Sequence, residues 1–297
     1  MRPLIQKLPY DNQTSFVTRT YRTPHFEVGW HQHIELELIL FTEGSGLGFV
    51  GNHVSEFETD DIYFIGSNLP HTFQKSYPEL ITSAVVVQFR DDFWGSTFIE
   101  LPEMQPVREL FMLALQGLKL NTGARESLAP LIRKLEFVEG FERILLLGQC
   151  LQLMAVQKAY KSLSTSQVQM HNPKSRERID RVFQFTVDNF KEPISLEKVA
   201  AIACLSVPAF CNYFKKSTQK TYIDFLNETR ISYACHLLLE TLKPIPAIAY
   251  DCGYNTSANF HKQFLKVKMT TPLQYRKLFV LGMTEKGANT GIVDVSR

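Results

Sequence analysis

The chain has 297 residues, of which 44% are apolar and 21% charged, which is ordinary for a globular protein and argues against a disordered or fibrous one. This length allows two domains. The apolar runs are too short to cross a bilayer and the first residues lack the apolar core of a signal peptide, so we expect a cytoplasmic protein without a membrane partner. Five cysteines without a C-x-x-C pair predict reduced, buried thiols.

The net charge of +2 hides an uneven distribution along the chain. Residues 1–173 carry 14 basic and 19 acidic side chains, a net charge of −5. Residues 174–281 carry 16 basic and 9 acidic side chains, a net charge of +7. This pattern favours contact between the second part and a polyanion, and a chance excess of charge on a solvated face is the alternative.

Three kinds of pattern follow one another along the chain. Residues 15–90 alternate apolar and polar in short stretches separated by turn residues such as Gly44-Ser45-Gly46, which predicts β-strands. Within residues 103–165, Leu110, Leu113, Ala114 and Leu118 recur at helical spacing, which predicts amphipathic helices. Residues 162–175 are polar and read as a linker. From Arg176 to about Leu281 we expect helices only.

The helical part contains an internal repeat. Ala200-x-x-x-Cys204 aligns with Ala249-x-x-x-Gly253 at an offset of 49, and Phe210-x-x-x-Phe214 aligns with Phe260-x-x-x-Phe264 at an offset of 50. Each copy predicts a short helix, a tight turn and a second helix, which is the helix-turn-helix pattern. Gly253 suits a turn with positive φ, whereas Cys204 predicts a slightly different turn in the first copy.

A helix is predicted between the two copies, over residues 222–240. At 1.5 Å per residue it is about 28 Å long. Successive major grooves on one face of DNA repeat every ~34–36 Å. A helix of this length is therefore suited to hold two recognition helices in successive grooves.

The residues of this region resemble the AraC/XylS family of transcription regulators. Those that carry the resemblance are Ile194 to Ala200, Leu205-Ser206, Phe214-Lys215-Lys216, Arg230-Ile231, Ala234, Leu237-Leu238, Ile248-Ala249, Cys252-Gly253-Tyr254, Phe260, Phe264, Thr271-Pro272 and Tyr275-Arg276. Gln219 and Met269 stand where the family commonly has a glycine after each recognition helix, and we interpret both as left-handed C-caps.

The resemblance implies double-stranded DNA as a partner. The four phenylalanines of the repeat are expected to be buried, so the outward positions of the second helix in each copy are the DNA-reading candidates. The predicted base contacts are Val207, Pro208, Asn212, Thr256, Ser257, Asn259 and Lys262. The predicted phosphate contacts are Lys215, Lys216, Lys266 and Arg276.

The front half also carries a resemblance. His31-x-His33-x-x-x-Glu37 followed by Gly44, and Asp60-Asp61 followed by His71, are similar to the two cupin motifs, which implies a cupin-like sensor domain. On a continuous strand His31, His33, Glu35 and Glu37 share one face, opposite Ile34, Leu36 and Leu38. The large aromatic residues Trp30, Phe41 and Phe64 are expected in the core.

We expect His31, His33, Glu37 and His71 to line an effector pocket rather than to hold a metal. The motif has His25 in place of its leading glycine, and the sequence shows no second shell. A site for Fe, Mn, Ni or Zn at the same four residues is the alternative, and no cofactor is predicted.

The expected fold is therefore α+β with two domains. Residues 1–100 form a cupin-like β-barrel, residues 101–165 form helices for dimerisation or linkage, and residues 176–281 form an all-α DNA-binding domain with helix-turn-helix units near 195–216 and 245–266. The expected function is a transcription regulator that responds to a small-molecule effector such as a sugar. It is expected to be a homodimer, with RNA polymerase as a partner if it is an activator. The alternative is a metal-dependent cupin enzyme that carries a DNA-tethering domain.

Overall fold

The computed structural model describes residues 4–5, 14–26, 28–75, 79–164 and 173–277. The chain divides into two compact units, of which the first comprises Met1–Asp188 with Ser195–Tyr222 and the second Asn189–Ile194 with Ile223–Arg297. Within the described ranges, none of the helices combines the length and the apolar character needed to span a membrane.

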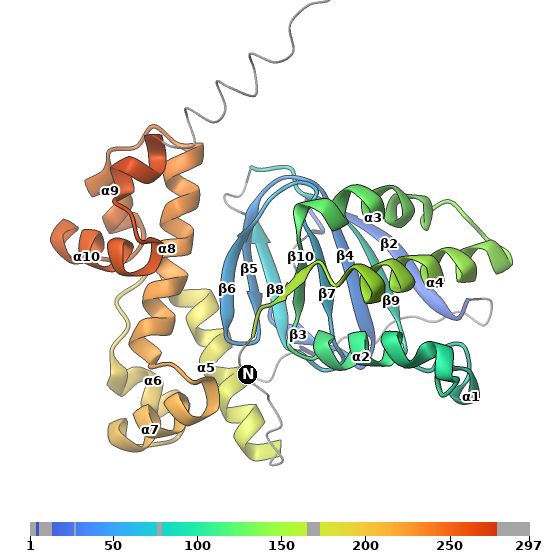
Figure 1. The fold of residues 1–297 in the computed structure, drawn as a ribbon. Coiled ribbons are helices and arrows are strands. Elements are labelled where there is room, and N and C mark those ends of the chain that lie inside the picture. Colours follow the sequence, from blue (N-terminus) through green and yellow to red (C-terminus); the bar gives the residue numbers. More distant parts are fainter. Residues whose placement is uncertain (1–3, 6–13, 27, 76–78, 165–172, 278–297) are drawn as a thin grey trace, which may run out of the picture. The chain divides into compact units, whose positions relative to one another are not determined.

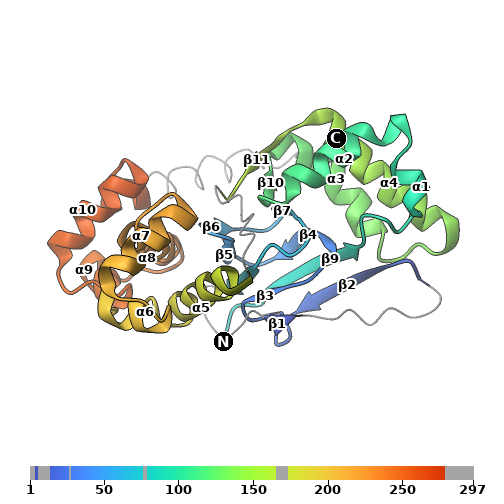
Figure 2. The same ribbon diagram turned by 90° about the horizontal axis from the view of Figure 1, so that it is seen from below.

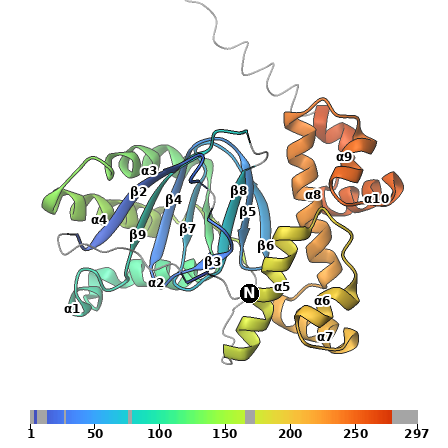
Figure 3. The same cartoon turned by 180° about the vertical axis from the view of Figure 1, so that it is seen from behind.

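The strands of the first unit form two sheets (Figure 1). The five-stranded sheet has the order β1 (Leu4–Ile5), β3 (His31–Gln32), β8 (His71–Lys75), β5 (Gly46–Val50) and β6 (His53–Phe57). The six-stranded sheet has the order β11 (Tyr160–Ser162), β10 (Leu118–Leu120), β7 (Ile62–Ile65), β4 (Leu36–Glu43), β9 (Ser83–Phe89) and β2 (Phe16–Arg22). Figure 3 shows β2, β9, β4 and β7 side by side in this order.

The predicted β-rich N-terminal domain is confirmed, but the closed barrel is not. Among the described strands the hydrogen bonds join two separate sheets, and all pairs are antiparallel except β1 with β3. The predicted burial of Trp30, Phe41 and Phe64 is confirmed, since each is at most 1% exposed.

Both faces of strand β4 are buried, and they enter different cores. Leu36, Leu38 and Leu40 belong to a cluster that includes residues of the helices which follow the sheet. Ile39 and Phe41 belong to a second cluster, with residues of β5, β6 and β8 from the other sheet. Because side chains alternate along a strand, Glu37 lies on the side of Ile39 and Phe41, between the two sheets.

Helices cover the other face of the six-stranded sheet (Figure 2). Their bounds are α1 (Ser96–Ile99), the 3₁₀-helix η1 (Pro102–Met104), α2 (Gln105–Ala114), α3 (Thr122–Lys134) and α4 (Gly140–Gln157). The helical spacing of residues 103–165 is confirmed for Leu110 and Ala114, which are buried. It was wrong for Leu118, which lies in β10, because Gly117 adopts a φ of +66° and the chain turns there.

The helix-turn-helix elements lie where the repeat predicts them. The helices are α5 (Pro173–Asn189), α6 (Leu196–Ile202), α7 (Val207–Thr218), α8 (Tyr222–Glu240), α9 (Ile245–Asp251) and α10 (Ser257–Lys268). The offset between α6 and α9 is 49 residues, and that between α7 and α10 is 50. Helix α5 begins at Pro173, three residues before the expected Arg176, because proline is favoured in the first turn of a helix. Most of the rest of the predicted linker falls on residues 165–172, which lie outside the described ranges.

The turns and caps of the two copies are alike. Gly253 has a φ of 79°, as predicted, and Cys204 has a φ of 53°. The expectation of a different first turn was therefore wrong, since Cys204 adopts the conformation that usually favours glycine. Gln219 and Met269 end α7 and α10 in the left-handed conformation, which confirms them as C-caps.

The cysteine prediction was correct only in part. Cys150, Cys235 and Cys252 are buried, but Cys204 and Cys211 are exposed. Cys204 lies in the turn of the first copy and Cys211 on the outer face of α7, where the helical period leaves them outside the core.

Candidate functional site

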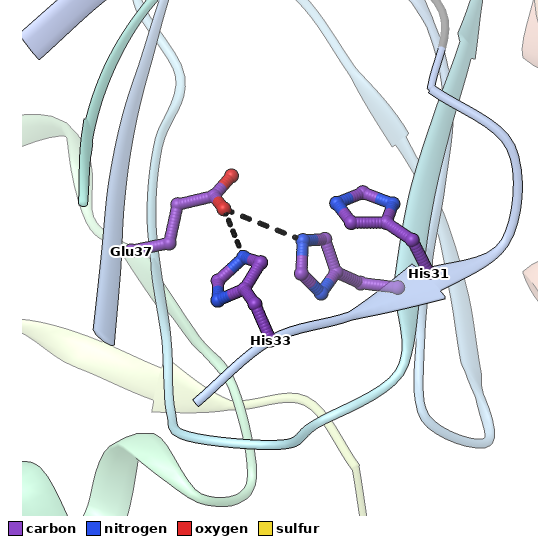
Figure 4. A group of neighbouring side chains, drawn as sticks. His31, His33 and Glu37 are labelled. Atoms are coloured by element: carbon purple, nitrogen blue, oxygen red, sulfur yellow. Dashed lines mark hydrogen bonds and ion pairs between the residues drawn. The ribbon is translucent and has the colours of Figure 1, made fainter. Parts of the chain in front are cut away.

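The first candidate site is a group of three histidines and one glutamate between the two sheets (Figure 4). Strand pairing brings its two segments together, because His31 of β3 is directly opposite His71 of β8. Glu37 enters from β4. The expected continuous strand over residues 31–38 was wrong: residues 33–35 lie between β3 and β4, and Ile34 is half exposed. The bend nevertheless leaves His33 buried and facing Glu37.

The four side chains converge on a small volume. One ligand atom from each lies within 4.8 Å of the others, and all four residues are buried. Nε2 of His33 is 2.5 Å from Oε2 of Glu37, and Nε2 of His71 is 3.6 Å from the same oxygen. The predicted convergence of the two segments is therefore observed.

Backbone carbonyl groups hold the other nitrogen of each ring. Nδ1 of His31 is 2.8 Å from the Gly29 carbonyl oxygen, and Nδ1 of His71 is 2.8 Å from that of Leu69. Nδ1 of His33 is 3.0 Å from the Glu35 carbonyl oxygen. A carbonyl oxygen only accepts hydrogen bonds, so each Nδ1 carries the proton and each ring is held with Nε2 toward the cluster.

Burial and mutual contact shift the pKa values of the cluster. Burial, reinforced by His71, lowers the pKa of His31 to about 3, so this ring is neutral at physiological pH. Burial opposes protonation of His33 too, but the Glu37 carboxylate outweighs it and the pKa of His33 is raised. Burial alone would raise the pKa of Glu37, yet His33 and His71 hold it well below its usual range. The cluster therefore contains a carboxylate, not a carboxylic acid.

One residue of the site was not found from the sequence. Gln88 of β9 is paired with Glu37 of β4, is 2% exposed, and donates from Nε2 to Oε2 of Glu37 at 2.8 Å. The sequence does contain a signal for this residue, because Gln88 is polar and stands between the apolar run Ala84–Val87 and Phe89. Period two places Gln88 on the face of Ala84 and Val86, and a buried amide there requires a partner.

The cluster opens onto a cavity with mostly apolar walls. The lining residues are Tyr21, Phe26, Val28, His31, Glu37, Ile39, Phe41, His71, Phe73, Ala84, Val86 and Gln88. Its room for water-sized molecules is about 40 Å³. A water molecule needs at least ~10–15 Å³ by this measure, so about three would fit. The cavity in this form suits an ion or a very small polar molecule, and a sugar would require it to open.

The second candidate site is the outer surface of the helix-turn-helix elements. The four phenylalanines of the repeat, Phe210, Phe214, Phe260 and Phe264, are fully buried, as predicted. Ser195 caps α6 through the Lys198 amide, and Thr256 caps α10 through the Asn259 amide. The buried stripe and the caps fix which residues of α7 and α10 face outward.

Comparison with known proteins assigns this part of the chain. A family profile described as "Helix-turn-helix domain" matches residues 199–278. The "HTH-type transcriptional activator RhaS" of Mannheimia succiniciproducens is 23% identical over 92% of this chain and 100% of its own length. The solved C-terminal domain of AraT, described as a response regulator from Geobacillus stearothermophilus, is 30% identical over 36% of this chain and 86% of that chain, with a TM-score of 0.33. A solved regulator from Chromobacterium violaceum, described as containing an AraC-type DNA-binding domain, is 24% identical over 36% of this chain and 95% of that chain, with a TM-score of 0.33.

The chain belongs to the AraC/XylS family. It is a DNA-binding transcription regulator, and the named relatives are regulators rather than enzymes. The expected family membership and the expected role as a DNA-binding transcription regulator are thus confirmed.

Helix α7 of the regulator presents few polar groups. Pro208, Asn212, Lys215 and Lys216 are exposed and Val207 is half-buried. Asn212 is the single amide among them, and the two lysines lie in the last turn of α7. The residues predicted to contact DNA from this helix are therefore accessible to a partner, although Val207 is only partly so.

Helix α10 presents a more polar surface. Thr256, Asn259 and Lys262 are exposed, and Ser257 is half-buried. The hydroxyl oxygen of Thr256 accepts a hydrogen bond from the backbone N–H of Asn259, so part of the hydrogen-bonding capacity of this hydroxyl is used in capping α10. His261, which the sequence reasoning passed over, is exposed between Asn259 and Lys262.

Two of the predicted phosphate contacts have partners within the protein. The Arg276 guanidinium donates to the carbonyl oxygens of Leu238 and Lys243, which lie at and after the end of α8. The Lys266 ammonium is 2.6 Å from a carboxylate oxygen of Asp224. Arg276 therefore stabilises the end of α8. Lys266 must break its ion pair with Asp224 before it can bind a phosphate group.

Proposed function

We propose that this regulator is controlled by a small polar ligand bound at the buried cluster of His31, His33, Glu37 and His71. The observation that carries the proposal is a carboxylate buried among imidazoles beside a cavity, in the part of a DNA-binding regulator that lies before the helix-turn-helix elements. The Glu37 carboxylate is paired with His33 and accepts a hydrogen bond from Gln88, as a buried charge requires. The cavity beside this pair supports the binding of a ligand here in addition to a role in packing.

We further propose that Trp30 transmits the state of this site. Trp30 immediately precedes His31, is 1% exposed, and its ring lies edge-on to Phe183 of α5 at 5.7 Å between centroids. Phe183 in turn contacts Phe214 of α7 at 5.9 Å. A ligand that shifts β3 changes the packing of this aromatic chain, and a ligand alters the balance of conformations only through such differential contacts.

Specific DNA reading is assigned, in this proposal, mainly to α10. Asn259 can form two hydrogen bonds with an adenine edge, and Ser257 can donate to or accept from several bases. Val207 and Pro208 of α7 offer apolar contact, for which thymine methyl groups are the matching chemistry. Asn212 and Lys262 complete the proposed base contacts, and Lys215, Lys216 and Lys266 the phosphate contacts.

The proposed assembly is a homodimer of an activator that contacts RNA polymerase. The RhaS relative is named a transcriptional activator. The apolar side chains of Phe141, Leu145 and Val156 on α4 are exposed. Their spacing places them along the same side of the helix, and an exposed apolar surface of this kind favours a protein partner.

A reporter assay tests the sensor role. The double variant His33→Ala with His71→Ala is compared with His25→Ala, which removes an exposed histidine of the same domain. The control is expected to respond to inducing growth conditions like the parent. The double variant is expected to lose this response, although the purified full-length double variant should still bind operator DNA. A normal response from the double variant refutes the sensor role.

A further inference from the structure

His261 is an exposed histidine on the outer surface of α10, and the base contacts proposed above do not include it. It lies one helical turn after Ser257, the first residue of this helix, so the two side chains lie on the same side of α10. Helix-turn-helix proteins contact base edges with residues near the start of the recognition helix. His261 therefore belongs to the part of α10 in which base contacts are expected.

Contacts within the helix fix the imidazole ring of His261. Its Nδ1 is 2.8 Å from the carbonyl oxygen of Ser257. The ring also lies edge-on to that of the fully buried Phe260, with 5.6 Å between the centroids. The hydroxyl oxygen of Ser257 is farther away, at 3.3 Å from the same Nδ1. Because a carbonyl oxygen only accepts hydrogen bonds, the shorter contact requires the proton to be on Nδ1.

The other ring nitrogen of His261 is then a hydrogen-bond acceptor. A neutral imidazole with its proton on Nδ1 carries a lone pair on Nε2. Among the residues that the structure describes, no hydrogen bond to Nε2 of His261 is observed. The adjacent Lys262 ammonium can only donate, whereas the side chains of Ser257 and Asn259 can both donate and accept. His261 therefore provides the outer surface of α10 with a group that accepts and does not donate.

We propose that His261 reads one base of the operator by accepting a hydrogen bond at Nε2 from an amino group in the major groove. Adenine presents an amino group there at N6 and cytosine at N4, whereas guanine presents O6 and thymine O4, which only accept. A lone pair on Nε2 that faces a keto oxygen leaves both atoms unpaired. His261 is thus a specificity-determining residue that selects adenine or cytosine against guanine or thymine at one position.

This inference rests on the proposed assignment of base reading to α10, and the two are distinguishable. Asn259 and His261 are two residues apart, and such residues do not share a face of a helix, so they are expected to read different base positions. If Asn259→Ala relaxes one position while substitution of His261 relaxes none, α10 remains the reading helix and His261 loses its role. If neither substitution changes any preference, the assignment of α10 fails as well.

The test is selection from a library of random duplex DNA with the purified full chain, followed by affinity measurements with each base in turn at every selected position. It is made at pH 8, where an imidazole of ordinary basicity is neutral. The parent is expected to prefer adenine or cytosine about fivefold at the position that His261 reads. This ratio corresponds to about 1 kcal/mol, the net contribution of one hydrogen bond. His261→Ala is expected to lose the preference.

A second variant and a matched control separate base reading from a structural role. His261→Arg replaces an acceptor with donors that match O6 and N7 of guanine, so the preferred base at this position should change to guanine. Loss of structure alone would not produce that change. Leu265→Ala removes an exposed side chain without hydrogen-bonding atoms one turn farther along α10, and it should keep the parent's preference.

Four results would overturn the proposal. They are a parent that selects no sequence, a preference that both His261 variants retain, an equal loss of preference in Leu265→Ala, and a parental preference for guanine or thymine at the position that His261→Ala relaxes.

Discussion

Replacing Gly253 with alanine is expected to disrupt the second helix-turn-helix unit. Gly253 has a φ of +79°, and a Cβ there would lie 2.7 Å from the carbonyl oxygen of Lys191 and 2.9 Å from Nη2 of Arg230. The left-handed backbone alone costs a non-glycine residue roughly 1–2 kcal/mol. Displacing the backbone of Lys191 adds steric strain.

The contact with Arg230 increases the expected loss. Arg230 is 9% exposed, and its guanidinium donates to the carbonyl oxygens of Phe190 at 2.7 Å and Glu192 at 2.8 Å. A hydrogen bond from a charged donor contributes about 1.5–3 kcal/mol, and a shifted guanidinium loses part of two such bonds. The combined destabilisation is therefore estimated at about 2–4 kcal/mol.

Gly148→Ala is the matched control. Gly148 lies within α4, where the nearest atom to a built Cβ is 3.9 Å away and φ is in the ordinary range. Alanine is favoured over glycine inside a helix by about 0.5–1 kcal/mol, so this variant is expected to be slightly stabilised. The two glycine-to-alanine changes thus have opposite expected signs.

Hydrogen–deuterium exchange of the full chain measures the effect locally. In Gly253→Ala, peptides from α8 and α9 should exchange at least about tenfold faster, because 1.4 kcal/mol corresponds to a factor of ten in an opening equilibrium. Operator binding should weaken in parallel. Unchanged exchange in α8 and α9, together with parental DNA affinity, would refute this account of the turn.

Two further predictions concern DNA reading and assembly. Asn259→Ala is expected to make the free energy of DNA binding less favourable by about 1–3 kcal/mol at one base position and to relax the preference there, whereas Lys266→Ala should weaken binding to all sequences alike. Binding to a library of operator sequences measures both effects. Equal losses for all sequences from both variants would show that Asn259 reads no base. Phe141→Asp with Leu145→Asp is expected to convert the proposed dimer to a monomer in light scattering, because charge on an apolar contact is not tolerated there. A parent chain that is itself monomeric, or a dimeric double variant, would contradict that interface.

The helix-turn-helix half was determined largely by local sequence. The repeat at offsets of 49 and 50 located α6, α7, α9 and α10, and the phenylalanine spacing identified their buried face. Helix pattern and caps depend on residues within a few positions of one another, so the sequence displays them directly. The turn of the first helix-turn-helix copy was the exception, because a cysteine at position 204 does not predict a positive φ.

The N-terminal site was determined only by tertiary structure. The sequence named His31, His33, Glu37 and His71, but not the bend at residues 33–35, the pairing of Glu37 with Gln88, or the carbonyl groups that direct the three rings. Nor did it show that the strands form two sheets rather than one closed barrel. Strand pairing joins residues that are 40 positions apart for His31 with His71 and 51 positions apart for Glu37 with Gln88. Register between such distant strands is set by the packing of whole faces, which no local period encodes.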